Sequence, residues 1–370
     1  MAGRRHIYAD NAATTCMSPR AIETMCRYLS CQYGNASQPY SFAREPKKAL
    51  KEARRIIADC INANPDEIYF TSGGTESDNW ALANAWQRNI VTTQIEHHAI
   101  LNTCADIENR GGNVSYLPPM PIGIIEIDIL EKSISPHSFV SVMTANNEIG
   151  TIEPISEYAS LVHGFNTVFH TDAVQAVGHI EINVKEWGVD MLSASGHKFN
   201  GPKGIGFLYV RSGIDLYPLI HGGAQENKKR AGTENVGAIM AMAVALRENM
   251  ENLQRNQKHL YLLEEILLDG LHKTGINFIR NGYNQLPGLL SLSFEGKNGE
   301  AILHRLDLLG ISVSTGSACD SKSTQISHVL RAIQLPTEYA KGTIRISFGK
   351  NNTEEDARTI ANALIRVLSS

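Results

Sequence analysis

Residues 190–204, DMLSASGHKFNGPKG, place a lysine beside a histidine, between a strand-like run of small residues and a turn rich in glycine and proline. Surface lysines usually lie among other charged groups, whereas Lys198 follows small, neutral side chains. An amine that loses hydration in such surroundings becomes a usable nucleophile or Schiff-base former. The segment alone fits an ordinary loop lysine equally well, so the rest of the chain has to decide.

Short apolar runs of strand length recur along the chain and alternate with amphipathic or alanine-rich helical patterns. The runs span residues 68–70, 90–93, 139–144, 167–170, 191–195 and 206–210. Such alternation is typical of an α/β domain with a mostly parallel sheet. We expect a first helix at 19–29, with Ser18 as its N-cap and Pro19 at its first position, and a second helix at 42–62.

The C-terminal part of the chain has a different pattern. From 235 to about 272 it is helical almost throughout, and a segment of that length commonly links two domains. Shorter strands at 290–294, 311–314 and 343–348 then alternate with helices, and the last helix begins with an acidic turn after Thr353. We predict a large ligand-binding α/β domain at 15–255 and a small α+β domain formed by 1–14 and 256–370.

Composition and charge exclude several classes of protein. The chain has 370 residues, of which 42% are hydrophobic and 19% are charged, as expected for a globular protein with a large core. A net charge of -4 gives no electrostatic reason to expect nucleic-acid or membrane binding. No apolar segment follows the basic N-terminus, and no run approaches the roughly 18 apolar residues of a membrane span. We expect a cytoplasmic location.

The six cysteines include no C-x-x-C pair, so the sequence suggests neither a zinc site nor a disulfide framework. Five of them are expected to be small buried hydrophobes: Cys16, Cys26, Cys31, Cys60 and Cys104. Cys319 differs because residues 314–325 contain no large apolar side chain that would anchor it. We interpret it as an exposed thiol on a mobile segment that enters a site; the alternative is an incidental surface cysteine.

Residues 71–79, TSGGTESDN, connect a predicted strand to an alanine-rich helix through a glycine turn. Such a turn directs free backbone N–H groups and the positive end of the helix dipole toward one point, and Thr75 adds a hydroxyl. A phosphate group is therefore the expected ligand of Gly74 and Thr75. The alternative is a turn without a ligand, and the missing lysine argues against a nucleoside-triphosphate loop.

Asp172 and Gln175 follow the predicted strand at 167–170, at the edge where ligands bind in open α/β sheets. A carboxylate there can keep a ring nitrogen protonated, which makes the ring an electron sink, and the amide can donate to a ring oxygen. The alternative is that Asp172 caps a helix.

Polar residues also follow two other predicted strands, at 96–98 and 144–150, and include His97 and Asn147. His97 and His98 could be metal ligands, but no third ligand at metal-site spacing accompanies them, so we expect no metal site. A flat imidazole could instead stack on a planar ring. Together, a phosphate turn, a stacking histidine, an asparagine, an aspartate and a lysine at successive strand ends describe a pocket for pyridoxal 5'-phosphate.

The chain resembles the cysteine desulfurase (NifS/IscS-like) branch of the class V aminotransferase superfamily, whose members are fold-type I pyridoxal phosphate enzymes. The similarity extends nearly from end to end. It rests on the motifs YADNAATT at 8–15, TSGGTESDN at 71–79, NNEIG at 146–150, SGHKFNGPKG at 195–204, GSAC at 316–319 and IRISFG at 344–349. The resemblance implies the fold-type I architecture and a homodimer.

The resemblance also implies roles for individual residues. Lys198 would carry the cofactor covalently. The cofactor's phosphate would be held by Gly74, Thr75, Ser195, His197 and, from the neighbouring subunit, Thr233.

Around the ring, the resemblance places His97 in a stacking position with a role in proton transfer, Asp172 at the pyridine nitrogen and Gln175 at the phenolic oxygen. Asn147 would lie near the ring oxygen and the substrate carboxylate. Arg345 would pair with that carboxylate through its two-pronged guanidinium.

By resemblance, Cys319 is the nucleophile that takes sulfur from L-cysteine as a persulfide, leaving L-alanine and serving iron–sulfur cluster assembly through an acceptor or scaffold protein. A selenocysteine lyase or another class V aminotransferase-type enzyme is an alternative, although the GSACDSKS segment argues against transamination. A non-catalytic scaffold is a further alternative, and the presence of both Lys198 and Cys319 speaks against it.

Several positions depart from the usual family pattern and leave the sulfur acceptor and the pathway open. They are Cys16, Ala36, Tyr40, Ala43, Ala224, Asn227 and Lys228.

Overall fold

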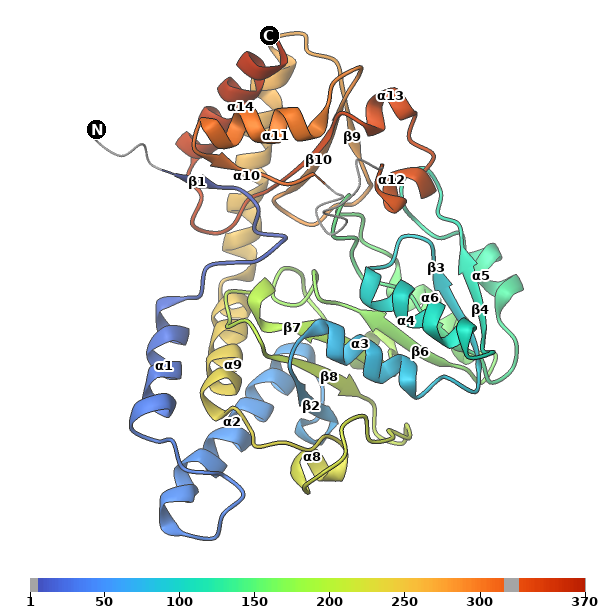
Figure 1. The fold of residues 1–370 in the computed structure, drawn as a ribbon, viewed down its shortest axis with the longest axis vertical. Coiled ribbons are helices and arrows are strands. Elements are labelled where there is room, and N and C mark those ends of the chain that lie inside the picture. The colour runs from blue at the N-terminus through green and yellow to red at the C-terminus, as the bar shows by residue number, and fades with distance from the viewer. Residues whose placement is uncertain (1–5, 316–325, 370) are drawn as a thin grey trace.

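The computed structural model describes residues 6–315 and 326–369, and in this part of the chain the largest element is a seven-stranded sheet (Figure 1). Its strands lie in the order β2 (Ile68–Thr71), β8 (Gly206–Val210), β7 (Met191–Ser195), β6 (Val168–Asp172), β5 (Phe139–Ser141), β3 (Asn89–Thr93) and β4 (Asn113–Leu117). The strands from β7 to β4 pair in parallel, whereas β8 is antiparallel to both of its neighbours. The predicted α/β class with a mostly parallel sheet is confirmed.

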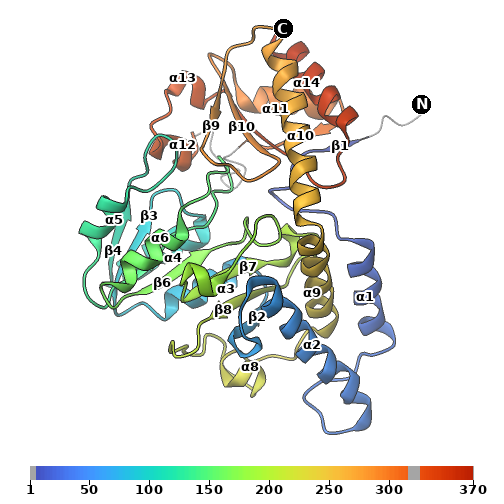
Figure 2. The ribbon, with the colours of Figure 1, turned by 180° about the vertical axis from the view of Figure 1, so that it is seen from behind.

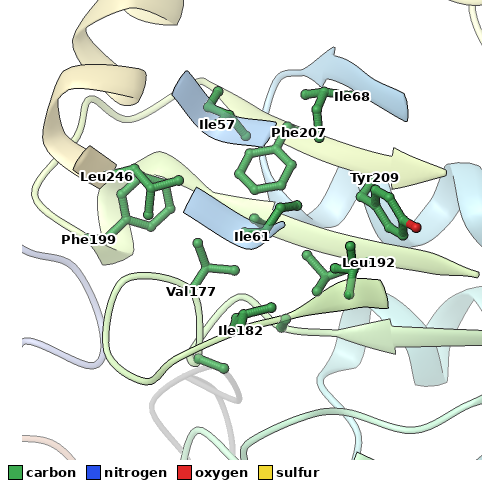
Figure 3. Close-up of a cluster of buried hydrophobic side chains, with 14 of the residues drawn as sticks. Ile57, Ile61, Ile68, Val177, Ile182, Leu192, Phe199, Phe207, Tyr209 and Leu246 are labelled. Atoms are coloured by element: carbon green, nitrogen blue, oxygen red, sulfur yellow. The ribbon is translucent and has the colours of Figure 1, made fainter. Parts of the chain in front are cut away.

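Helices connect the strands of this sheet and cover it. They are α1 (Pro19–Ser30), α2 (Arg44–Ile61), α3 (Gly74–Ala83), α4 (His98–Asn109), α5 (Ile127–Ser133), α6 (Ile155–His163), α7 (Val184–Trp187), α8 (Gln225–Lys228) and α9 (Val236–Glu251). The predicted cap of α1 is present, because the Ser18 side chain accepts from the Ala21 N–H. Figure 3 shows Ile57 and Ile61 of α2 beside Phe207 of β8 in the main apolar cluster.

The C-terminal elements surround a second apolar cluster that includes Leu263, Leu292, Ile344 and Leu364. These elements are α10 (Leu253–His272), β9 (Phe278–Asn281), β10 (Leu289–Phe294), α11 (Gly299–Leu308), β11 (Ile311–Ser312), β12 (Thr343–Ser347) and α14 (Glu354–Leu368). Helices α12 (His328–Ala332) and α13 (Thr337–Ala340) contribute instead to a small separate cluster with Ile95 and Ile149. Strands β12, β10 and β9 form an antiparallel sheet, and β1 (Ile7–Tyr8) pairs in parallel with β11. The N-terminal strand therefore lies among C-terminal elements (Figures 1 and 2).

The stretch predicted to be helical almost throughout, 235–272, consists of the two helices α9 and α10, which are separated at Asn252. Asn252 has φ -113° and ψ 12°, and its side-chain amide donates to the Glu248 carbonyl. Asparagine favours such helix ends because its side chain competes for backbone hydrogen bonds. Helices α9 and α10 follow one another along the long axis of the molecule (Figure 2) and contribute to different apolar clusters. The predicted bounds at 15–255 and 256–370 stay a prediction.

Two further expectations need correction. The strand predicted to reach residue 144 ends at Ser141, because Met143 already donates its N–H to Glu96 in the loop beyond β3. Cys16, Cys26 and Cys31 are exposed, so they are not the buried hydrophobes that the sequence predicted. Within residues 6–315 and 326–369, no helix has the length and apolar character needed to cross a membrane.

Candidate active site

A cavity of about 690 Å³ lies where β3, β5, β6 and β7 end, beside the turn that leads into α3. Its lining includes Gly74, Thr75, His97, Asn147, Asp172, Gln175, Ser195, His197, Lys198 and Arg345. The fold therefore brings together these residues from distant parts of the sequence, at the edge of the sheet where α/β proteins bind ligands. Thr233 is exposed, and Cys319 lies outside the described residues.

Lys198 is the last residue of the short 3₁₀ helix Gly196–Lys198, which follows β7 directly. Its Nζ donates to the backbone carbonyl of Ala12 at 2.6 Å and to that of Ala13 at 2.9 Å. The two carbonyls belong to the segment between β1 and α1, which closes the cavity on that side. These acceptors could not be predicted from the sequence, because every residue type has the same backbone carbonyl.

Gln175 shares one of these acceptors. Its Nε2 donates to the Ala12 carbonyl at 2.9 Å, and its side chain is 7% exposed. The Ala12 carbonyl thus ties the strand-end loop of β6 to the lysine turn of β7. This contact holds the amide and the amine next to one another in the same cavity.

Asp172 is the last residue of β6 and is 5% exposed. Burial raises the pKa of its carboxyl group to about 6, while the Val174 N–H and the charge of Lys198 act in the opposite direction. The Val174 N–H donates to Asp172 Oδ1 at 2.9 Å, yet no helix begins there. The alternative that Asp172 serves as a helix cap is therefore wrong.

The turn before α3 needs glycine because neighbouring protein atoms leave no room for a side chain at the start of the helix. A Cβ on Gly74 would approach Val174 Cγ2 to 2.5 Å, and Gly73 has φ 153°. The turn is also fixed from outside, since Glu76 accepts from the Ser72 N–H at 2.8 Å and pairs with Arg230 at 2.9 Å. The start of α3 is therefore held at the cavity, and a helix N-terminus in such a position favours an anionic ligand.

His197 lies beside this turn, and its Nδ1 is 3.1 Å from the Thr14 hydroxyl. Burial lowers the pKa of His197 to about 4, with smaller contributions from the charges of Lys198 and Lys203. In the ligand-free protein His197 is therefore a neutral hydrogen-bonding group. Ser195, the last residue of β7, is buried next to it.

His97 precedes α4 and caps it, because its Nδ1 accepts from the Ala99 N–H at 3.1 Å. Burial lowers the pKa of His97 to about 4, with Lys198 and His98 contributing. A neutral imidazole that accepts at Nδ1 carries its proton at Nε2. The ring therefore enters the cavity as a donor of fixed orientation.

The fold brings Asp78 and Asp172 to His97, with one ligand-type atom of each lying within 4.8 Å of the others. These two aspartates do not lie at metal-site spacing from His97 in the sequence, and only the fold places them beside it. A cluster of this kind is compatible with a ring held between the imidazole and the carboxylates. The expectation of no metal site stays a prediction.

Arg345, on β12, is 6% exposed and reaches the cavity from the C-terminal elements. Its Nη1 donates to the Asn147 backbone carbonyl at 2.8 Å, and its Nη2 donates to Asp10 Oδ1 at 2.7 Å. Its buried Nε has no hydrogen-bond partner among the described residues. An incoming carboxylate would therefore compete with Asp10 and the Asn147 carbonyl for the two Nη groups. Asp10 lies in the quoted motif at 8–15, but sequence reasoning gave it no role.

Comparison with known proteins agrees with this geometry. Residues 7–360 match the family model "Aminotransferase class-V". The chain is 44% identical over 374 residues to the cysteine desulfurase IscS of Dictyoglomus turgidum, covering 99% of this chain and 95% of the relative. A solved NifS-like protein superposes with a TM-score of 0.93 at 37% identity, covering 99% of this chain and 100% of the other. A structure described as SspA in complex with cysteine has a TM-score of 0.83 at 34% identity, covering 94% and 100%. The chain therefore belongs to the class V aminotransferase family, in its branch of NifS- and IscS-like cysteine desulfurases.

Proposed function

We propose that the chain is a pyridoxal phosphate-dependent cysteine desulfurase, which converts L-cysteine to L-alanine and transfers the sulfur to Cys319 as a persulfide. The observation that carries the proposal is the meeting of the Lys198 amine and the buried Asp172 carboxyl in one cavity. The names of the relatives support the same activity, because those compared by sequence are called cysteine desulfurases.

The residues present fit pyridoxal phosphate. The cavity volume lies within the range of cofactor sites. A glycine turn at a helix N-terminus suits the phosphate, and the space beside Gly74 is too small for any larger residue. Asp172 suits the pyridine nitrogen, because a buried carboxylate is stabilised by a cation at its side. Gln175, Ser195, His197 and Thr75 supply the remaining hydrogen bonds at the cavity wall.

When bound, the cofactor supplies an electron sink for the negative charge that develops on the substrate α-carbon. The chain's own residues supply the positions and the protons. Arg345 fixes the substrate carboxylate, which would take the place of Asp10 at the guanidinium. Lys198 would hold the cofactor through Nζ, and the same amine would move the α-proton of the substrate. His97 donates a proton from Nε2, where its cap to α4 keeps it.

Cys319 lies outside the described residues, but the chain before it ends at the cavity. Ser314 lines the cavity, and its backbone pairs with that of Arg345. Cys319 is the fifth residue after Ser314, so its Cα lies at most about 17 Å from that of Ser314. After the segment, Ser327 donates to the buried Glu148 at 2.6 Å. Both ends are thus fixed close to the proposed site, which supports sulfur transfer to Cys319.

The proposal is tested by incubating the purified, cofactor-loaded protein with L-cysteine and a thiol reductant. We expect alanine and sulfide in equal amounts. Cys319→Ser should stop sulfide release while the visible absorbance of the bound cofactor persists. Sulfide release at the unsubstituted rate from that variant would contradict the nucleophile assignment, and a selenocysteine lyase would release selenide from selenocysteine but little sulfide from cysteine.

We further propose a homodimer in which Thr233 reaches the phosphate site of the neighbouring subunit. Thr233 is exposed, and a contact of 3.4 Å between Ser37 and Glu234 places a loop with exposed aromatic side chains beside it. Those side chains include Tyr33, at 70% exposure, and Phe42, at 44%. Sedimentation should give twice the mass of the chain, and a monomer that retains full activity would contradict the proposal.

We place the protein in the cytoplasm, where exposed thiols such as Cys16, Cys26 and Cys31 stay reduced. The proposed destination of the sulfur is an acceptor or scaffold protein of iron–sulfur cluster assembly. Mixing the persulfide-bearing protein with such an acceptor should move labelled sulfur to it. Retention of all label on the enzyme would reject that acceptor.

A further inference from the structure

Asp78 is a buried carboxyl group that the proposed function does not use. It lies on α3, the helix whose first turn faces the proposed phosphate site, and it is 1% exposed. One of its oxygens lies within 4.8 Å of an Asp172 oxygen and of a His97 ring nitrogen. The two carboxyl groups therefore form a close pair at the base of the cavity.

Two negative charges cannot be accommodated together at this depth. Burial and the nearby Asp172 raise the pKa of Asp78 well above its usual value, while the Ser193 hydroxyl acts in the opposite direction. The nearby Glu96 is held toward its neutral, protonated form, because burial raises its own pKa well above the usual value. Like-charged carboxyl groups in one buried site share a proton. The Asp78–Asp172 pair should therefore hold one proton and one charge.

The surroundings decide which of the two carries the charge. Asp172 accepts the Val174 N–H and lies in the field of Lys198, and both stabilise its ionised form. Asp78 is in contact with the Ser193 hydroxyl, and its Oδ1 is buried without a hydrogen-bond partner among the described residues. An ionised oxygen left unpaired at this depth would be costly. The negative charge is thus favoured on Asp172 and the proton on Asp78.

A chain of hydrogen bonds behind Asp78 accommodates that proton. Ser193 Oγ lies 3.0 Å from His170 Nε2, and His170 Nδ1 lies 2.9 Å from Ser141 Oγ. Burial lowers the pKa of His170 to about 3, so the ring is neutral and has one donor and one acceptor. One consistent direction exists if Asp78 donates to Ser193, Ser193 donates to His170 Nε2, and His170 Nδ1–H donates to Ser141.

We propose that Asp78 is a neutral positioning residue, which keeps the proton of the Asp78–Asp172 pair and confines the single negative charge of the site to Asp172. The groups facing Asp78 are Asp172 and His170 from β6, Ser193 from β7, and Glu96 and His97 from the loop after β3. The inference rests on the proposed function for the role of Asp172 at the ring nitrogen. Its consequence is that the charge opposite the ring stays fixed while the cofactor reacts.

Infrared spectroscopy of the cofactor-loaded protein at neutral pH tests the protonation state directly. With carbon-13 label in the aspartate carboxyls, we expect a carbonyl stretch of a protonated carboxylic acid that shifts with the label. The band should disappear in Asp78→Asn. A spectrum without this band in the unsubstituted protein, or a band that persists in Asp78→Asn, would overturn the proposal. Absence of visible absorbance from every loaded protein would instead reject the proposed function.

A second measurement separates positioning from a merely structural role. Because asparagine replaces one neutral group by another, Asp78→Asn should leave the pH midpoint of the visible band unchanged. Asp78→Leu removes the hydrogen bond to Ser193 and should release the cofactor roughly threefold to tenfold faster, whereas Asn should restore slow release. A midpoint displaced to lower pH in Asp78→Asn would mean that Asp78 is ionised. Equal release rates for Leu and Asn would mean that it positions nothing.

Discussion

His170→Gln should make the stability of the cofactor-free protein less sensitive to acid. His170 is fully buried between Ser141 and Ser193, and burial lowers its pKa to about 3. An unfolded histidine has a pKa of about 6.5, so the unfolded chain gains a proton at pH values where the folded chain does not. Stability is therefore present above pH 6.5 and is lost as the pH falls toward the pKa of the folded state.

Between pH 7.5 and pH 5 this residue should remove about 2 kcal/mol from the free energy of unfolding, or about 1.4 kcal/mol for each of 1.5 pH units. Urea unfolding of both proteins at the two pH values measures the effect. His170→Gln lowers stability at pH 7.5 through its lost hydrogen bonds, but the further loss on going to pH 5 should be smaller by about 2 kcal/mol. His221→Gln, at an exposed site, controls for the substitution. An equal acid-induced loss in the unsubstituted protein and in His170→Gln would refute the reasoning.

Three further predictions concern other parts of the structure. Lys228 has φ 66°, so Lys228→Gly should raise the free energy of unfolding by about 0.5–1 kcal/mol, whereas Lys229→Gly, at φ -98°, should lower it by a similar amount. Equal urea midpoints for these two variants would contradict the assigned strain. Gly74→Ala should lose bound cofactor on gel filtration, because its Cβ would come within 2.5 Å of a neighbouring methyl group at a cost of about 1–3 kcal/mol; unchanged retention would show that the turn tolerates a side chain. Asp10→Asn should lower the KM for cysteine roughly fivefold, equivalent to about 1 kcal/mol, because Asp10 competes with the substrate for Arg345. A raised KM would instead make Asp10 an orienting partner.

Local patterns were sufficient to predict the strand ends and most of the cavity. Lys198 follows β7 and Asp172 ends β6, and the apolar run of each strand is visible in the sequence. The parallel arrangement of β6 and β7 brings these strand ends to one edge of the sheet. The sequence could not show the Ala12 and Ala13 carbonyls that hold Lys198, because any residue type offers the same carbonyl. The sequence also could not show that α9 and α10 are separated at Asn252, where the side-chain amide donates to the Glu248 carbonyl within a strongly helical pattern.

Contacts between distant segments account for the other omissions. Asp78 lies within the glycine-turn motif on α3, but the role proposed for it depends on its proximity to Asp172, which ends β6. The pairing of Arg345 with Asp10 joins opposite ends of the chain. The three exposed cysteines were predicted to be buried because cysteine is buried on average. Such an average does not determine the exposure of an individual residue.

The central claim is that Lys198 carries pyridoxal phosphate. Treating the cofactor-loaded protein with borohydride fixes such a bond, and peptide mass mapping then locates the added mass. We expect the added mass of the reduced cofactor on the peptide containing Lys198, and no modification of that peptide in Lys198→Ala. Cofactor mass on another lysine, or none on any peptide of a protein that nevertheless releases sulfide from cysteine, would contradict the account.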